Sequence, residues 1–132
     1  MNITFVMANP SMSGGDRVCA IYAQKLNALG HKVSIIAPKQ RFLSIRKQIR
    51  RMLSGDSWLS KKVQMQSHFD LLGLSVTYAT DFLPLKDKHV PDADVVIATW
   101  WETAEWVNDF MAEKGKKVYF IQHYEVFDHL PI

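Results

Sequence analysis

The chain has 132 residues, of which 48% are hydrophobic and 22% are charged, with a formal net charge of +3. These values are typical of one globular domain with a core of its own. No apolar run approaches the roughly 18 residues that a membrane-spanning helix needs, and residues 1–4 lack the basic start of a signal peptide.

The first third of the chain predicts a strand, a helix and a second strand. Ile3–Ala8 is a continuous apolar run, which is typical of a strand buried on both faces of a parallel sheet. Apolar residues then recur at helical spacing over Arg17–Leu29, and Gly30 is expected to end that helix. Val33–Ala37 is the second strand. The unit is a βαβ crossover, whose strands are parallel and whose connection is right-handed.

The turn between the first strand and the helix contains Gly14 and Gly15, followed by Arg17. Glycines let a ligand approach the backbone, and the unpaired amides of a helix's first turn favour an anion such as phosphate. A second interpretation stays open: Ser13 and Asp16 fit a capping box, and the glycines would then only close a tight turn. The chain contains no G-x-G-x-x-G sequence, so a dinucleotide fingerprint is not supported.

The next segment is strongly basic. Residues 39–62 contain eight basic residues and one acidic residue, so they carry +7 and leave −4 for the rest. Phe42–Leu53 predicts an amphipathic helix whose polar face bears Arg46, Lys47, Arg50 and Arg51. That face is either simply solvated or docks on an anionic membrane or a lipid-phosphate acceptor. No aromatic residues alternate with the cations, so a nucleic-acid partner is not expected.

The remainder of the chain continues the α/β alternation. No firm element is predicted for residues 54–72; Ser75–Thr80 is expected to be a strand and Asp81–Ala93 a loop. The last predicted elements are a buried strand, a helix ended by Gly115 and a final strand, over Asp94–Thr99, Glu102–Glu113 and Lys117–Gln122. We therefore expect a Rossmann-like, three-layer α/β fold around a mostly parallel open sheet.

Three clusters of polar and aromatic residues follow strands of this predicted sheet. They are Ser11–Arg17, Thr99–Glu102 and His123–Glu125. Ligands of open α/β sheets bind beyond the carboxyl ends of the strands, so the three clusters should meet along one edge. His123 can donate to a phosphate or a sugar hydroxyl there, or simply bond the neighbouring loop.

Trp100 and Trp101 lie at the start of the helix that follows the predicted strand Asp94–Thr99. Adjacent helical residues point in different directions, so we expect one tryptophan in the core and one facing the ligand cleft. Glu102 and Glu105 complement the dipole of that helix, which we favour over an acid–base role. Cys19, the single cysteine, excludes an internal disulfide, suits a reducing cytoplasm and is expected to be a buried structural thiol.

The other histidines do not suggest a metal site. His31 falls at the far end of the sheet, where a turn role is expected. His68, His89 and His129 lack metal-ligand spacing with one another or with a carboxylate. No metal site is predicted.

The order and spacing of several motifs resemble glycosyltransferase family 4, whose members have the two-domain GT-B fold. The resemblance rests on residues 13–18, 26–33, 94–100 and 118–123, and covers most of the chain except residues 54–75. Residues 120–125 also resemble bacterial rhamnosyltransferases of surface polysaccharides, although that subgroup often has Asp where this chain has His123.

This resemblance implies transfer of a sugar from a nucleotide-sugar donor to a polysaccharide or glycolipid acceptor, with retention and without a metal or dinucleotide cofactor. It implies that Gly14 and Gly15 lie near the donor phosphates and the acceptor. His123 would be the catalytic residue near the transferred sugar, with Arg17, Trp101 and Glu125 also binding substrate.

The family's second domain, with its E-x(7)-E motif, is not present in this chain. Residues 1–132 are therefore expected to be the amino-terminal, acceptor-side half of a GT-B enzyme, cytoplasmic or peripheral at the inner membrane face. We expect that half alone to be inactive. The alternative is a non-catalytic α/β module that binds a phosphorylated ligand or an anionic membrane partner.

Overall fold

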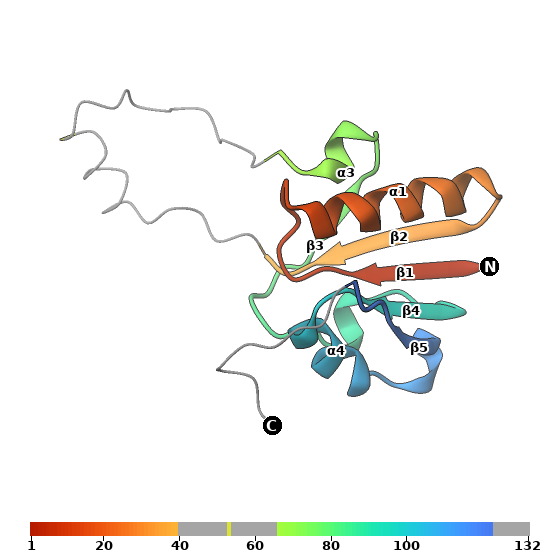
Figure 1. Ribbon diagram of the computed structural model, residues 1–132. Helices are drawn as coiled ribbons and strands as arrows, with labels where there is room; N and C mark the ends of the chain where they lie inside the picture. The colour runs from red at the N-terminus through yellow and green to blue at the C-terminus, as the bar shows by residue number, and fades with distance from the viewer. Residues whose placement is uncertain (40–52, 54–65, 123–132) are drawn as a thin grey trace.

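The computed structural model describes residues 1–39, 53 and 66–122. Within these residues the chain forms one five-stranded sheet with the order β3-β2-β1-β4-β5, and all of its strand pairs are parallel (Figure 1). The order reverses between β1 and β4. This is the arrangement of a doubly wound α/β sheet, so the predicted open parallel sheet is confirmed.

The centre of the sheet consists of β1 (Asn2–Val6), β2 (Lys32–Ala37) and β4 (Val95–Ala98). β1 pairs with both neighbours, with Phe5 opposite Ile35 on one side and Ile97 on the other. Its last four residues are all buried, as the continuous apolar run predicts.

Two short strands form the edges. β3 (Val76–Tyr78) pairs with β2, and β5 (Lys116–Tyr119) pairs with β4. Gly115 precedes β5 with φ +105°, and a Cβ there would lie 2.7 Å from the backbone of Asp94 and Val95. Glycine is therefore required where the chain passes the start of β4.

The helices divide between the two faces of the sheet. α1 (Gly14–Ala28) and α3 (His68–Leu71) pack on the face that carries Ile3, Phe5 and Ile35. α4 (Trp101–Asn108) packs on β4 and β5 from the other face. Two buried clusters thus lie on opposite sides of one sheet, which gives the expected three layers.

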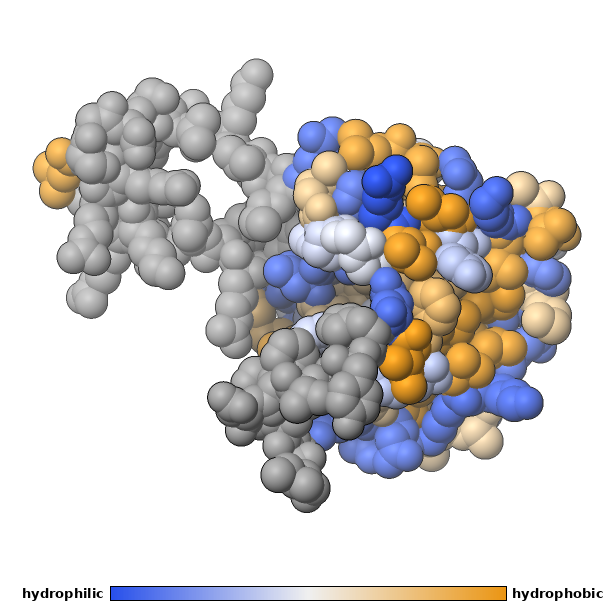
Figure 2. Space-filling view, in the orientation of Figure 1, coloured by the Kyte–Doolittle hydropathy of each residue, from blue (hydrophilic) through white to orange (hydrophobic). Residues whose placement is uncertain are grey.

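On the α1 face, α1 contacts β2 and leaves β4 and β5 less covered. Tyr22 on α1 and Val118 on β5 are exposed large hydrophobic residues on this face. Figure 2 shows hydrophobic residues in a band across the visible face between the region of α1 and that of β4 and β5.

Several predicted boundaries are wrong. α1 begins at Gly14 rather than Arg17, because Ser13 is its N-cap and both glycines adopt helical positions. α4 ends at Asn108 rather than Glu113, and only a 3-10 turn, η2 (Ala112–Lys114), follows. Phe110, between them, is buried in the core, so the chain turns inward there.

Two elements were not predicted. α3 lies at the end of the segment to which no element was assigned, and η1 (Asp87–His89) lies in the predicted loop Asp81–Ala93. The cap of α3 is readable in the sequence: Ser67 and Asp70 form a capping box of the type considered at Ser13 and Asp16.

The predicted basic helix lies outside the described residues, except for Leu53. In the part of the chain that the structure describes, no helix has the length and apolar character needed to cross a membrane.

Candidate functional site

The site is built on the first turn of α1. Ser13 has an extended backbone, with φ −66° and ψ 157°, and its Oγ accepts a hydrogen bond from the Asp16 N–H at 3.2 Å. The Arg17 N–H is bonded to the Ser13 carbonyl at 3.1 Å. The N–H groups of Gly14 and Gly15 have no acceptor among the described residues, so they remain available to an anion.

The glycines are not required by the backbone. Neither has a positive φ, and a Cβ at Gly14 would meet no atom within 4 Å. Glycine here costs helix stability relative to alanine, without relieving a clash. The space beside Gly14 is therefore open for a ligand.

The carboxylate of Asp16 does not complete the predicted capping box. Its Oδ2 accepts bonds from Ser11 instead, at 2.8 Å from the N–H and 2.5 Å from the hydroxyl. The Ser11 Oγ in turn accepts from the Ser13 N–H at 3.2 Å. Asp16 thus fixes the loop before α1.

His68 braces the same loop from α3. Its backbone N–H donates to the Ser11 carbonyl at 3.2 Å, and its Nε2 lies 3.0 Å from the Met12 carbonyl oxygen. This contact requires the proton on Nε2. The sequence analysis weighs His68 only as a metal ligand and finds no suitable spacing. No local sequence pattern indicates that His68 holds this loop.

Gln122, the third residue after β5, connects that strand's end to α1. Its side-chain amide lies against Gly15, where a Cβ would be 3.4 Å from Oε1, and Nε2 donates to the Cys19 Sγ at 3.3 Å. The ring of Phe120 also lies 5.1 Å from that of Tyr22 on α1. The end of β5 and the start of α1 are therefore adjacent, as the predicted convergence requires.

Cys19 is the buried structural thiol that the sequence predicts. Burial, and secondly the charge of Asp16, raises its pKa from 9.0 to about 12, against a smaller opposing effect of the Gln122 hydrogen bond. The thiol is therefore protonated at neutral pH and is a poor nucleophile.

The end of β4 joins the same edge. The Thr99 hydroxyl donates to the Val6 carbonyl at 2.8 Å, which fixes it to the end of β1. Thr103 accepts from the N–H groups of Thr99 and Trp100 at 3.0 and 2.9 Å and so shapes the turn into α4. Trp100 and Trp101 are both half-buried, so the expected division into one core and one cleft tryptophan is not observed.

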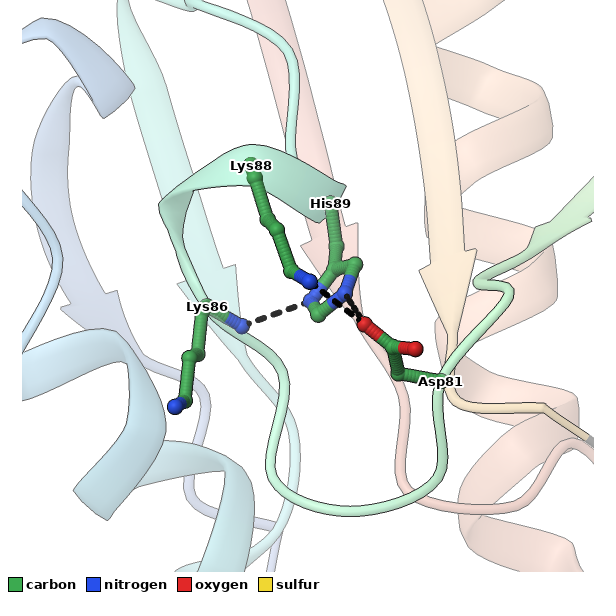
Figure 3. Close-up of polar contacts among 4 residues, drawn as sticks. All are labelled: Asp81, Lys86, Lys88 and His89. Atoms are coloured by element: carbon green, nitrogen blue, oxygen red, sulfur yellow. Dashed lines mark hydrogen bonds and ion pairs between the residues drawn. The ribbon is translucent and has the colours of Figure 1, made fainter.

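A second polar cluster follows the carboxyl end of β3 (Figure 3). Asp81 Oδ2 lies 2.7 Å from the Lys88 ammonium and 2.8 Å from His89 Nε2. Hydrogen bonds from Lys88 and then His89 lower the pKa of Asp81 from 3.8 to about 2. The sequence did not indicate this His–carboxylate pair.

His89 in this cluster has both ring nitrogens occupied. The Lys86 N–H donates to Nδ1 at 2.9 Å, so the proton that points at Asp81 is on Nε2. Its side chain is only 6% exposed. The cluster therefore stabilises the connection between β3 and β4 rather than offering a free base.

The structure places four of the predicted site residues on one edge of the sheet: Gly14, Gly15, Arg17 and Trp101. Arg17 is exposed and has no ion-pair partner among the described residues. His123, Glu125 and the basic residues Arg46, Lys47, Arg50 and Arg51 lie outside the described residues. Sequence reasoning missed Gln122, whose contact with Cys19 spans 103 residues, and Thr103, whose hydrogen bonds to Thr99 and Trp100 shape the turn into α4.

The described edge offers amide donors, an exposed guanidinium and the positive end of a helix dipole, which together can bind an anionic group. In the described ranges, no three His, Cys, Asp or Glu side chains gather as metal ligands would. Comparisons of the chain with protein-family models, curated protein sequences and solved structures found no match.

Proposed function

We propose that this chain is the acceptor-side domain of a retaining glycosyltransferase of the GT-B type. It would help to transfer a sugar from a nucleotide-sugar donor to a polysaccharide or glycolipid acceptor. The observation that carries the proposal is the contact of Gln122 with Gly15 and Cys19. It joins the end of β5, directly before His123, to the open glycine turn.

The family resemblance suggests the reaction, and the open glycine turn at the start of α1 supports the proposed location of the donor phosphates. The N–H groups of Gly14 and Gly15 would hold a phosphate of the donor, and Arg17 would add a positive charge one turn further on. In this proposal His123 contacts the transferred sugar, and Trp101 and Glu125 bind substrate. No metal or dinucleotide cofactor takes part, and a second domain would contribute the other wall of the cleft.

The test measures ligand binding and transfer separately. Calorimetric titration of the chain with UDP-, GDP- and dTDP-linked sugars and with pyrophosphate should detect binding. Replacing Gly14 by Val should weaken it by more than about tenfold, because the new side chain fills the open space beside the amides.

A matched control is Ala28→Val, which places the same valine side chain at the exposed last residue of the same helix. It should leave binding unchanged. Binding that is insensitive to Gly14→Val would contradict the location of the site. Sugar transfer by the isolated chain would contradict the expectation that a second domain is needed.

A second candidate function is a non-catalytic module that binds a phosphorylated ligand. The exposed Arg17 and the amides of Gly14 and Gly15, none of which has a partner among the described residues, favour it, because these groups need no second domain to hold a phosphate. Binding of pyrophosphate without preference for any nucleotide-sugar, together with no transfer when a candidate second domain is added, would favour this module over the enzyme.

A further inference from the structure

The loop that follows β3 presents consecutive apolar residues to solvent at the carboxyl edge of the sheet. Phe82 and Leu83 are each 47% exposed, and Pro84 is exposed beside them. The next residue, Leu85, is buried in the cluster of the α4 face, so the chain turns back into the core there. We define the β3 loop tip as Phe82, Leu83 and Pro84.

The base of this loop is held by the ring of His89. Its Nδ1 accepts from the Lys86 N–H at 2.9 Å, and its Nε2 lies 2.8 Å from the Asp81 carboxylate. The ring thus joins the residues on either side of the β3 loop tip (Figure 3). The Asp81 carbonyl also accepts from the Lys39 N–H at 3.0 Å, which ties the loop to the chain just after β2. The apolar tip therefore stands on a base that is fixed to the fold.

Basic residues adjoin the β3 loop tip. Lys39 Nζ lies 5.1 Å from the centre of the Phe82 ring, and Lys86 is exposed at the other end of the tip. The Lys88 ammonium is paired with Asp81, so that pair adds no net charge. Residues 39–62, which carry +7 in the sequence, begin at Lys39. The most basic stretch of the chain is therefore joined directly to a residue that contacts the apolar tip.

The size of the tip argues against a protein partner. Two half-exposed side chains offer on the order of 200 Å² of apolar area, against the roughly 800 Å² that each partner buries in a stable protein interface. A second copy of the chain would also bring two segments of charge +7 together. A lipid surface needs no matched area, because an apolar tip enters the headgroup region while nearby cations attract anionic headgroups.

We propose that the β3 loop tip docks on an anionic lipid surface, with the side chains of Phe82 and Leu83 inserted between the headgroups. Parallel strands end at a common edge, so the tip and the first turn of α1 lie at the same edge of the sheet. Docking therefore turns that edge toward the lipid. The proposal does not depend on sugar transfer or on the anion site.

Sedimentation of the whole chain with lipid vesicles tests the docking. We expect binding to vesicles of equal parts phosphatidylcholine and phosphatidylserine, weakening as salt increases, and no binding to phosphatidylcholine alone. Phe82→Ser and Leu83→Ser should each weaken binding about threefold or more, because each removes apolar contact with the lipid. The control is Leu29→Ser, since Leu29 is 74% exposed and follows α1 at the opposite edge of the sheet.

A fluorescent label separates insertion from adsorption by charge alone. Leu83→Cys and Leu29→Cys each provide one exposed thiol for an environment-sensitive label. Cys19 does not compete at neutral pH, because it is buried and its pKa is raised to about 12. On mixed vesicles, the emission of the label at position 83 should shift to the blue, whereas that of the label at position 29 should not.

Circular dichroism of each variant verifies that the fold is retained. The proposal is overturned if the chain does not bind the mixed vesicles, or if Leu29→Ser weakens binding as much as Phe82→Ser. It is also overturned if both tip variants bind as tightly as the natural chain and the label at position 83 does not shift, because the basic segment alone would then explain the binding. A dimer that Phe82→Ser abolishes would overturn it as well, since a second copy would then be the occupant.

Discussion

Cys19 is the residue whose chemistry the structure constrains most directly. Its thiol lies on the buried face of α1 and accepts a hydrogen bond from Gln122, and burial raises its pKa to about 12. In the unfolded chain the thiol has its ordinary pKa near 9.0. The folded state therefore binds this proton more tightly than the unfolded state does.

Stability should consequently fall at high pH. The contribution of Cys19 is fully present below pH 9 and decreases as the pH rises toward 12, because only the unfolded thiol ionises readily in that range. Lysine and tyrosine side chains also titrate there, so the comparison with Cys19→Ala isolates the effect. In urea unfolding at pH 8 and pH 10.5, we expect the stability advantage of the natural chain over this variant to shrink.

Chemical labelling gives an independent measurement. Iodoacetamide should react slowly with Cys19 in the native chain at pH 8 and at the rate of a free thiol in urea. Rapid native labelling would mean that Cys19 is not held as a buried thiol.

Cys19 and Gln122 also differ in how far the sequence predicts them. Cys19 falls in a recognisable amphipathic helix, so its burial follows from the pattern. Gln122 is polar and follows a short strand, and its contact with Cys19 spans 103 residues of sequence. No local sequence pattern encodes such a contact, so the position of Gln122 beside α1 follows only from the order of the strands in the sheet.

Among the elements, the short segment before β5 is the most tightly constrained. Gly115 has φ +105°, and any Cβ there would overlap the backbone at the start of β4. Gly73, before β3, also has a positive φ of +69°, but its surroundings are open. Comparing alanine substitutions at Gly73 and Gly115 therefore separates the free-energy cost of a positive φ from the cost of steric overlap with a neighbouring strand.

We expect Gly73→Ala to reduce the free energy of unfolding by about 1–2 kcal/mol through its left-handed backbone alone. Gly115→Ala should add about 1–3 kcal/mol more, because the overlap with Asp94 and Val95 forces β5 away from β4. Urea unfolding of both variants measures the difference. Equal losses would show that the backbones of these strands separate easily.

Element type was more predictable than element ends. Both central strands of the βαβ unit follow from continuous apolar runs, and Gly30 occupies the left-handed position after α1 as expected. The sequence predicts the start of α1 three residues too late, because glycines disfavour helices and the Ser13 cap overrides that preference. Hydrophobic periodicity alone does not show whether the low helix propensity of glycine or the N-cap decides where a helix begins.

At the scale of the whole molecule, one topological feature brings the candidate site together. The strand order reverses between β1 and β4, so the connections after these two strands leave the sheet on opposite faces. The first turn of α1 and the turn into α4 consequently lie at the same edge of the sheet, and Gln122, after β5, contacts Gly15 there. The sequence predicted this convergence because parallel strands end at a common edge.

This geometry predicts a collective response to an anionic ligand. When the ¹⁵N-labelled chain is titrated with pyrophosphate, the amide resonances of Gly14, Gly15 and Gln122 should shift together. Their shifts should fit a single dissociation constant, because one bound anion contacts α1 directly and Gln122 packs against Gly15. Amides at the opposite edge, such as those of Asn2 and Lys32, provide the internal control and should not move.

Gln122→Ala sharpens that measurement, because it removes the side chain that joins the end of β5 to α1. In this variant the amides of Gly14 and Gly15 should still respond, whereas the response of residues 120–122 should fall by more than half. If residues 120–122 respond as strongly without the side chain, the contact is not what couples the strand end to the turn. If Asn2 and Lys32 shift as much as Gly14, the anion binds the basic surface at large, and the converging strand ends do not form its site.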